Sequence, residues 1–359
     1  MANAFKPLDP KDVTLTRTLL HEAIPLTGTI VSGTYNEAVT ADSNIKNYSH
    51  GMFQSVYDYP YLSSSANHTF DLTFGYSANS TLSGNIASVT RVQQEKKINI
   101  YNQMAQVLMG FDSTGSIKEF RIPGGSIIRE AYFMSFTRLL TKDEVSKNNF
   151  SIVLDDTGGG RAWSGPGTQM KYQTLQIPTS NNEPVFYTDS PAGEYSVLSA
   201  SATSNQGSGS VGLIFYQAGI VVLGTASIGN LTGSQGATGV DALGATTLLQ
   251  LATGSSISAS CNGLRHNIAD ISFNNTTELN STIYFCRANH NEFNYSSNPT
   301  YLTASKIMVK EDKGDQPISY ITTVGLYSPD NELLATAKLS EPLKKDPSSE
   351  YTLRVRLDY

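Results

Sequence analysis

The last nine residues of this sequence alternate apolar and polar side chains with a period of two. That spacing places successive side chains on opposite faces of a β-strand. One face of the expected strand carries only apolar and aromatic residues: Tyr351, Leu353, Val355, Leu357 and Tyr359. The other face is polar and includes Arg354 and Arg356. Residues 70–76 alternate in the same way, so strands are expected both early in the chain and at its end.

The composition also favours strands and turns over helices. Only 16% of the 359 residues are charged, against roughly 25% in typical soluble domains. Their place is taken by Ser, Thr, Asn and 29 glycines, of which Thr suits strands and the others suit turns. We therefore expect a mainly β chain with one prominent α-helix and two or more β-sandwich-like domains.

One segment, residues 91–109, has the period of an amphipathic helix. Thr90 and Gln93 have the spacing of a capping box, and Gly110 stands where a helix commonly ends. Apolar residues recur on one side of this helix: Ile100, Tyr101, Met104, Val107 and Leu108. Packing of that face on the chain's own sheet is favoured over packing in a ring of identical subunits.

The glycine-rich stretch after Asp155 suggests a boundary between domains. We expect an N-terminal arm over residues 1–35 that includes an extended stretch before Pro25, and a β-rich domain with the helix over residues 36–160. The remainder, residues 161–359, would form one or more C-terminal β domains that end in strands over 319–359. Residues 126–155 are interpreted as a β pair that turns at 142–149, and residues 210–224 as a strand pair that turns at Gln217–Gly219.

The charge pattern excludes one class of partner and suggests another. The net charge is −6 and no run of Lys or Arg is present, so a nucleic-acid-binding surface is not expected. Between Tyr195 and Leu264 the only charged residue is Asp241, whereas an exposed monomer surface normally carries interspersed charge. This window suggests a surface that is covered by other protein.

The chemistry-bearing residues are scattered. Cys261 and Cys286 are the only cysteines, and two free thiols are favoured over one disulfide. His266 and His290 follow them at spacings that superficially suggest zinc, but the short CxxC or HxxxH loops that zinc usually requires are missing. Asp155-Asp156 before three glycines is interpreted as a turn and not as a cation site. We therefore predict no catalytic residues, no cofactor, no metal and no enzymatic activity.

A cluster of aromatic residues has two interpretations. Tyr57, Tyr59 and Tyr61 lie close together, and Trp163 is the only tryptophan. Such side chains are more often core or subunit contacts, but they also form platforms on which sugars stack. A glycan is therefore kept as the alternative ligand.

The start of the chain carries no signal for export. Residues 1–20 lack the apolar core of a signal peptide, and no window approaches the roughly 18 apolar residues of a membrane span. We expect synthesis and assembly in a cytoplasm, with no membrane span.

The last two fifths of the sequence carry a resemblance. "NEFNYSSNPTY" (residues 291–301), followed by "ISYITTVGLYSPDNELLATAKLSEPLKKDPSSEYTLRVRLDY" (residues 318–359), resembles a C-terminal module in virion structural proteins of large tailed bacteriophages, of the T-even-like marine and cyanobacterial myovirus type. "GLIFYQAGIVVL" is similar to a strand pair upstream in the same proteins.

The resemblance implies a structural component of a virion, in the contractile tail, baseplate or neck, that assembles with other virion proteins and with copies of itself. Synthesis and assembly would take place in the host cytoplasm. The alternatives are a receptor- or glycan-binding tail protein that serves host attachment, and a capsid decoration protein. The closing strand is the predicted assembly element, held in place by its apolar face.

Overall fold

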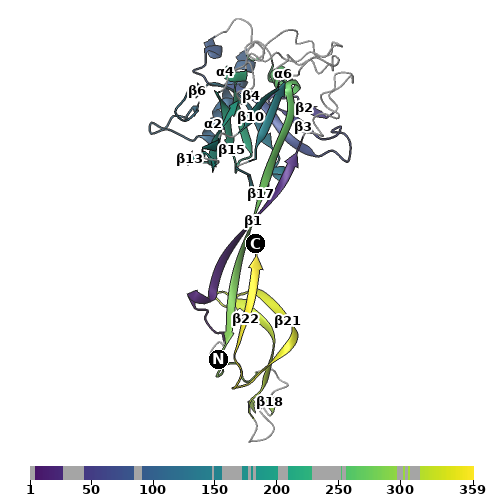
Figure 1. Ribbon diagram of the computed structural model, residues 1–359, viewed down its shortest axis with the longest axis vertical. Coiled ribbons are helices and arrows are strands. Elements are labelled where there is room, and N and C mark those ends of the chain that lie inside the picture. The colour runs from purple at the N-terminus through teal and green to yellow at the C-terminus, as the bar shows by residue number, and fades with distance from the viewer. Residues whose placement is uncertain are drawn as a thin grey trace. The chain divides into compact units, whose positions relative to one another are not determined.

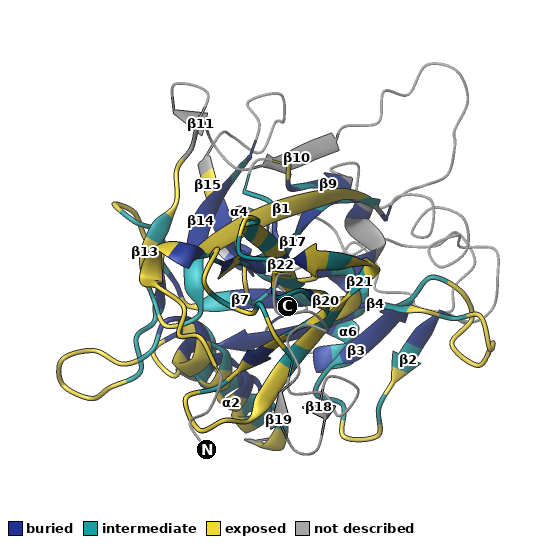
Figure 2. Ribbon diagram, turned by 90° about the horizontal axis from the view of Figure 1, so that it is seen from below, coloured by how far each residue is buried: buried dark blue, intermediate teal, exposed yellow. Residues whose placement is uncertain are grey.

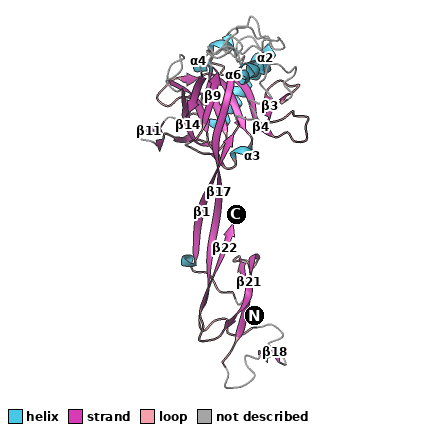
Figure 3. Cartoon of the chain, turned by 45° about the vertical axis from the view of Figure 1, so that its right-hand side comes forward, coloured by secondary structure: helices cyan, strands magenta, loops and turns pink. Residues whose placement is uncertain are grey.

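The computed structural model describes residues 5–26, 44–84, 91–147, 149–155, 172–176, 179–180, 183–200, 209–228, 252, 256–296, 302–303, 306–307 and 316–359. Strands predominate over helices (Figure 3). The chain divides into two compact units: unit 1 comprises residues 1–19 and 278–359, and unit 2 comprises residues 20–277. The prediction of a mainly β chain with one prominent helix is confirmed, and the strands form several sheets.

Unit 2 is built on one sheet, in which strands from distant parts of the sequence are neighbours (Figure 1). The first part of β17 (Ile268–Ala288) pairs with β9, and the order continues β10, β14, β15, β16, β7, β4, β3 and β2. The strands on this path are β2 (Ile45–Asn47), β3 (Gln54–Tyr57), β4 (His68–Tyr76), β7 (Glu130–Phe136), β9 (Ser151–Asp155), β10 (Tyr172–Gln176), β14 (Gly193–Ala200), β15 (Gly209–Phe215) and β16 (Ile220–Gly224).

Shorter elements complete unit 2. β8 pairs with β17 and β13 with β14, whereas β5–β6 and β11–β12 are two-stranded ladders. These strands are β5 (Phe120–Arg121), β6 (Ile127–Ile128), β8 (Glu144–Val145), β11 (Thr179–Ser180), β12 (Glu183–Pro184) and β13 (Tyr187–Ser190). The helices are α2 (Arg91–Leu108), α3 (Arg138–Thr141), α4 (Thr225–Ile228) and α6 (Ile257–Asn267), with a 3-10 turn at Thr81–Gly84.

The long helix α2 packs on strand β4 of its own sheet, as the sequence predicted. Gly75 in β4 makes this possible, because a Cβ atom there would lie 2.6 Å from the Lys97 carbonyl oxygen and 2.8 Å from the Tyr101 nitrogen. Gly110, with φ at +73°, follows the helix end. The predicted apolar stripe is wrong at one position, because Val107 is 63% exposed. Thr90 of the expected capping box lies outside the described residues.

The interior of unit 2 is rich in aromatic residues. Phe133 and Phe120 have ring centroids 5.6 Å apart, and Tyr101 meets Phe120 edge-on at 5.4 Å. Strand β7 is buried at every position from Ala131 to Met134, so both of its faces are covered. This double burial explains why residues 130–136 show no clear alternation in the sequence.

Unit 1 contains the second part of β17, the first part of β1 (Val13–Pro25) and the C-terminal strands (Figure 1). β22 (Tyr351–Asp358) pairs antiparallel with β17, with Val355 opposite Tyr284. β20 (Ser319–Tyr327) and β21 (Leu333–Lys345) form a separate antiparallel hairpin. A short ladder joins β18 (Leu302–Thr303) to β19 (Lys306–Ile307), and a 3-10 turn at Pro10–Asp12 precedes β1.

Three sequence predictions about connectivity need correction. The boundary at residue 160 does not separate domains, because β7 pairs with β16 and β9 pairs with β10 within one sheet. The expected pair across residues 142–149 does not form either: β7 lies between β4 and β16, whereas β9 lies between β10 and β17. Finally, residues 161–359 do not form a separate C-terminal part, because this range up to Thr277 belongs to unit 2 and residues 278–359 belong to unit 1.

The hairpin expected over residues 210–224 is confirmed as β15 and β16, with Gly219 in the left-handed region at φ +64°. The interpretation of the surrounding charge-poor window needs revision. Its described strands, including Leu213, Phe215 and Val222, are buried inside unit 2. Their lack of charge is therefore explained by the unit's own core, and residues 201–208 and 229–244 of the window lie outside the described residues.

Candidate functional site

The closing strand β22 has the alternation that the sequence predicted. Val355 is buried, Tyr351, Leu353 and Leu357 are half-buried, and the intervening Thr352, Arg354, Arg356 and Asp358 are exposed. Tyr359 departs from the expectation of a buried end, because it follows the last residue of the strand and is 73% exposed.

Several polar contacts hold the end of β22 against β17. The Ser281 hydroxyl lies 2.5 Å from Asp358 Oδ1 and donates to it, and the backbone nitrogen of Tyr359 donates to the Asn280 carbonyl at 2.9 Å. Arg356 Nη2 donates to the same Ser281 hydroxyl at 3.0 Å, and its Nε donates to Asp358 at 2.6 Å. The polar face of the strand therefore contributes to closing the unit.

A buried lysine joins the two parts of the C-terminal segment that carry the resemblance. Lys345, at the end of β21, is 0% exposed, and its Nζ donates to Asn294 Oδ1 at 2.8 Å and to the His290 carbonyl at 3.3 Å. Asn294 in turn donates to the His290 carbonyl at 2.8 Å, and Ser319 donates to the Phe293 carbonyl. The turn at residues 290–294 is thus bound to the "LKK" end of β21.

The sequence analysis did not assign Lys345 a role. The signal was present as a lysine pair at the end of a strand, but a surface position is the ordinary expectation for lysine.

Unit 1 exposes far more apolar side chains than it buries. Its buried apolar residues, among those the structure describes, are Ile283, Ala288, Leu326 and Val355, each between 5% and 9% exposed. Eleven large apolar side chains of the unit are exposed: Phe5, Leu8, Leu15, Leu19, Phe293, Tyr295, Tyr320, Tyr327, Leu333, Leu334 and Tyr359. Residues 14–19 of β1 are exposed on both faces, as the yellow ribbon of β1 shows (Figure 2).

Some of these exposed side chains touch one another. Phe5 and Tyr327 have ring centroids 4.3 Å apart, and Tyr327 of β20 lies opposite Leu333 of β21. Gly325 lies between them, since a Cβ atom there would be 3.0 Å from the Tyr327 ring and 3.4 Å from Leu333. We name the exposed apolar residues of β1, β20 and β21, together with Tyr359, the exposed strand face of unit 1.

The three tyrosines predicted as contacts lie on and beside the loop after β3, in unit 2. Tyr57 is half-buried, whereas Tyr59 and Tyr61 are 58% and 37% exposed. The Tyr57 ring lies 6.3 Å from Tyr61 and 5.4 Å from His68, between ring centroids. Trp163 lies outside the described residues, so it is not placed with them.

Two polar contacts support this aromatic loop. Asp58 accepts hydrogen bonds from the backbone and side-chain nitrogens of Asn67 at 2.6 and 2.8 Å. His68 Nε2 lies 2.9 Å from Asp71 Oδ1, and this hydrogen bond raises the pKa of His68 above its usual value although partial burial opposes the shift.

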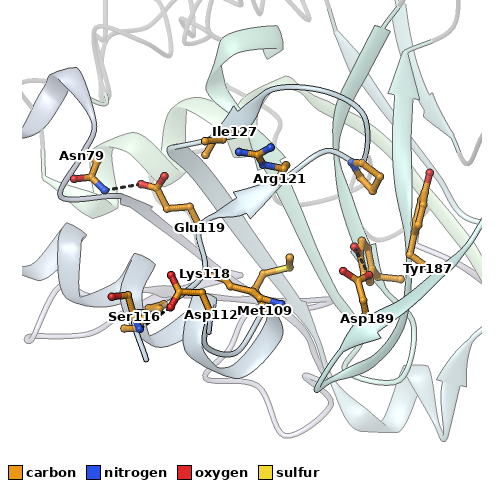
Figure 4. Close-up of a pocket in the computed structure, with 13 residues that line it drawn as sticks. Asn79, Met109, Asp112, Ser116, Lys118, Glu119, Arg121, Ile127, Tyr187 and Asp189 are labelled. Carbon is orange, nitrogen blue, oxygen red and sulfur yellow. Dashed lines mark hydrogen bonds between the residues drawn. The ribbon is translucent and has the colours of Figure 1, made fainter. Parts of the chain in front are cut away.

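A pocket of about 680 Å³ opens elsewhere in unit 2, between the end of α2, the β5–β6 ladder and strands β13 and β14 (Figure 4). Tyr187 and Tyr195 stack in its wall with ring centroids 5.5 Å apart, and the Tyr195 hydroxyl donates to Asp189 at 2.8 Å. Lys118 and Arg121 also line it, and its lining contains neither histidine nor cysteine. Its aromatic, acidic and basic groups suit binding of a polar ligand; the sequence analysis did not identify it.

Glu119 in the pocket wall is held as a carboxylate. Burial raises its pKa, but hydrogen bonds from the Ser77 hydroxyl and from Asn79 Nδ2, together with Arg129, more than offset this and lower it below the usual value. Figure 4 shows the Asn79 contact as a dashed line. These partners fix the carboxylate as a structural acceptor.

The groups considered for metal or thiol chemistry are dispersed. Cys261 and Cys286 are free thiols, the first buried in unit 2 and the second half-buried in unit 1. Burial raises the pKa of the Cys261 thiol, so it is protonated at neutral pH. Over the described ranges, no three His, Cys, Asp or Glu side chains are grouped to hold a metal ion.

The same part of the chain contains no helix with the length and apolar character needed to cross a membrane.

Comparison of the chain with models of protein families, with curated proteins and with solved structures found no match.

Proposed function

We propose that this chain is a structural component of a bacteriophage virion, in the contractile tail, baseplate or neck, and that it acts by assembling with other virion proteins and with copies of itself. The observation that carries the proposal is the exposed strand face of unit 1, whose β20, β21 and Tyr359 residues lie in the segment that carries the resemblance. Strands with apolar side chains on the surface and little core beneath them are typical of subunits that are covered by other protein.

Lys345 adds a structural link between the two ends of that segment within unit 1. A buried lysine is stable only when its charge is compensated by hydrogen bonds, and two of its three acceptors come from His290 and Asn294, the third being the Asp346 carbonyl. The turn at residues 290–294 and the strand β21 therefore depend on each other. A module of this kind supports a scaffolding role without any reacting group.

The proposal is tested by locating the protein in the particle. Antibodies against the purified chain should label purified virions of the bacteriophage that encodes it at the tail, baseplate or neck, and mass spectrometry of those virions should detect the chain. Labelling of the head surface would favour a capsid decoration protein. Absence of the chain from purified virions would contradict the proposal.

Host glycan binding is the second candidate, because unit 2 presents two aromatic sites. Tyr59 and Tyr61 are exposed beside Tyr57, and the pocket holds the stacked Tyr187 and Tyr195 with charged groups around them. Aromatic faces flanked by polar groups suit sugar rings. Selective sub-millimolar binding on a glycan array, lost in Tyr59→Ala with Tyr61→Ala or in Tyr187→Ala, would favour this function; a blank array would remove it.

A further inference from the structure

We propose that the exposed strand face of unit 1 is covered by the same face of further copies of this chain, and that unit 1 is ordered only in that oligomer. The inference rests on the proposed assembly function and names the partner. It starts from the contrast between the four buried apolar residues of unit 1 and its eleven large exposed ones.

The first argument is the size of the face. The exposed fractions of the seven side chains of this face add up to about four complete side chains, which at roughly 150 Å² each amounts to on the order of 600 Å². A stable protein–protein interface of standard size buries about 800 Å² on each partner, of which somewhat more than half is apolar. The apolar surface of unit 1 is therefore large enough for a specific, lasting contact.

The strands of unit 1 have open edges. Among the described strands, β20 and β21 pair only with each other, and β22 pairs only with β17. Unpaired edge strands with apolar side chains invite pairing with another chain. A symmetric contact between like edges satisfies both copies at once, which is the geometry of the commonest oligomers.

Two properties of unit 1 favour a second copy of the chain, over a different protein, as the partner that covers this face. Unit 1 has little core of its own, so the protein that covers its exposed strand face must be present when the chain folds. Other copies of the chain are always present at that time. Its charge also permits self-association: unit 1 has 12 Lys and Arg against 13 Asp and Glu. Near-neutral surfaces do not repel one another.

The test uses the full-length purified chain. Sedimentation velocity and light scattering should show an oligomer at micromolar concentration. Hydrogen exchange should show protection of residues 278–296 and 316–359 that falls when the oligomer is diluted, whereas the core strands of unit 2 stay protected at both concentrations.

Matched variants separate this face from other exposed apolar residues. Leu15→Asp with Leu334→Asp changes two residues of the face that are 73% and 67% exposed, whereas Leu62→Asp with Leu139→Asp changes two in unit 2 that are 85% and 75% exposed. We expect the first pair to weaken association at least tenfold and to unprotect unit 1. The second pair should leave both properties unchanged.

Two results would overturn the inference: a monomeric wild-type chain whose unit 1 is fully protected, or an oligomer that the unit 2 pair dissociates and the unit 1 pair does not. A failure of the virion proposal would look different. In that case the chain would form the oligomer but would not be found in purified particles.

Discussion

Unit 2 buries an extensive aromatic and aliphatic core, whereas unit 1 buries only Ile283, Ala288, Leu326 and Val355 among its described residues. Both units are built from antiparallel strands, so the difference does not lie in the secondary structure. It lies in what covers the strand faces: helices and neighbouring strands in unit 2, and mostly solvent in unit 1. A unit of this size normally buries most of its apolar surface within itself, so the comparison suggests that unit 1 is incomplete as a single chain.

The largest expected effect is the removal of β22. Deletion of Glu350–Tyr359 removes an antiparallel pairing with β17 that runs from Ser281 to Ala288, together with Val355, one of four buried apolar residues. We expect a chain whose unit 2 keeps its cooperative unfolding while unit 1 is disordered and particle incorporation is lost. Circular dichroism and hydrogen exchange measure the folding of the two units, and an incorporation assay measures entry into particles. Normal incorporation of the truncated chain would show that unit 1 does not need this strand.

The next effect compares one core residue from each unit. Phe133→Ala removes a ring that is 1% exposed and packed against Phe120 and Tyr101, and should cost about 3–5 kcal/mol of the free energy of unfolding of unit 2. Val355→Ala removes two methyl groups and should cost about 1–2 kcal/mol, yet it should weaken oligomer formation more. Denaturant titration gives the free energy of unfolding, and sedimentation gives the strength of oligomer formation. A Val355→Ala cost as large as that of Phe133→Ala would mean that unit 1 has a core of its own.

A smaller effect concerns Lys97 in α2, whose side chain is buried in unit 2. Burying this amine costs free energy, which the rest of the core of unit 2 offsets. Burial lowers the pKa of Lys97 to about 8, and its Nζ donates to the Ala252 carbonyl at 2.9 Å. Between pH 8 and the unfolded value near 10.5 the unfolded chain binds more protons at Lys97, so this residue contributes stability that rises with pH, by up to about 3 kcal/mol over the range. The Cys261 thiol of the same unit acts in the opposite direction, because burial raises its pKa and the unfolded chain loses that proton first.

The Lys97→Met variant tests the assignment. The free energy of unfolding of the wild type, relative to that of the variant, should rise between pH 8 and 9.5, because Cys261 titrates in both proteins and the range lies below the titration of the buried tyrosines. The same slope in both proteins would show that Lys97 does not titrate in this range.

The comparison also shows which parts of the fold could be predicted from the sequence. Period-two alternation predicted β22 and residues 70–76 of β4, and an apolar run interrupted at Gln217–Gly219 predicted the β15–β16 hairpin, because each of these patterns is local in the sequence. Pairing across the sheet was not accessible: β7 is buried on both faces and lacks alternation, and its partners β4 and β16 are distant in sequence. The exposed strand face could not be predicted either. A period-two pattern indicates that one face of a strand is apolar, but it does not indicate whether the chain itself covers that face.

The smallest expected effect is the double change Arg354→Ala with Arg356→Ala on the polar face of β22. Both side chains are exposed, and ion pairs at exposed positions typically contribute less than about 1 kcal/mol. Arg356 also donates to the Ser281 hydroxyl and to Asp358, but Ser281 keeps its own bond to Asp358 when the guanidinium is removed. We therefore expect near-normal hydrogen exchange of β22 and near-normal incorporation into particles, in contrast to the truncated chain. Loss of incorporation with an intact oligomer would instead identify the polar face as a charged contact with another protein of the particle.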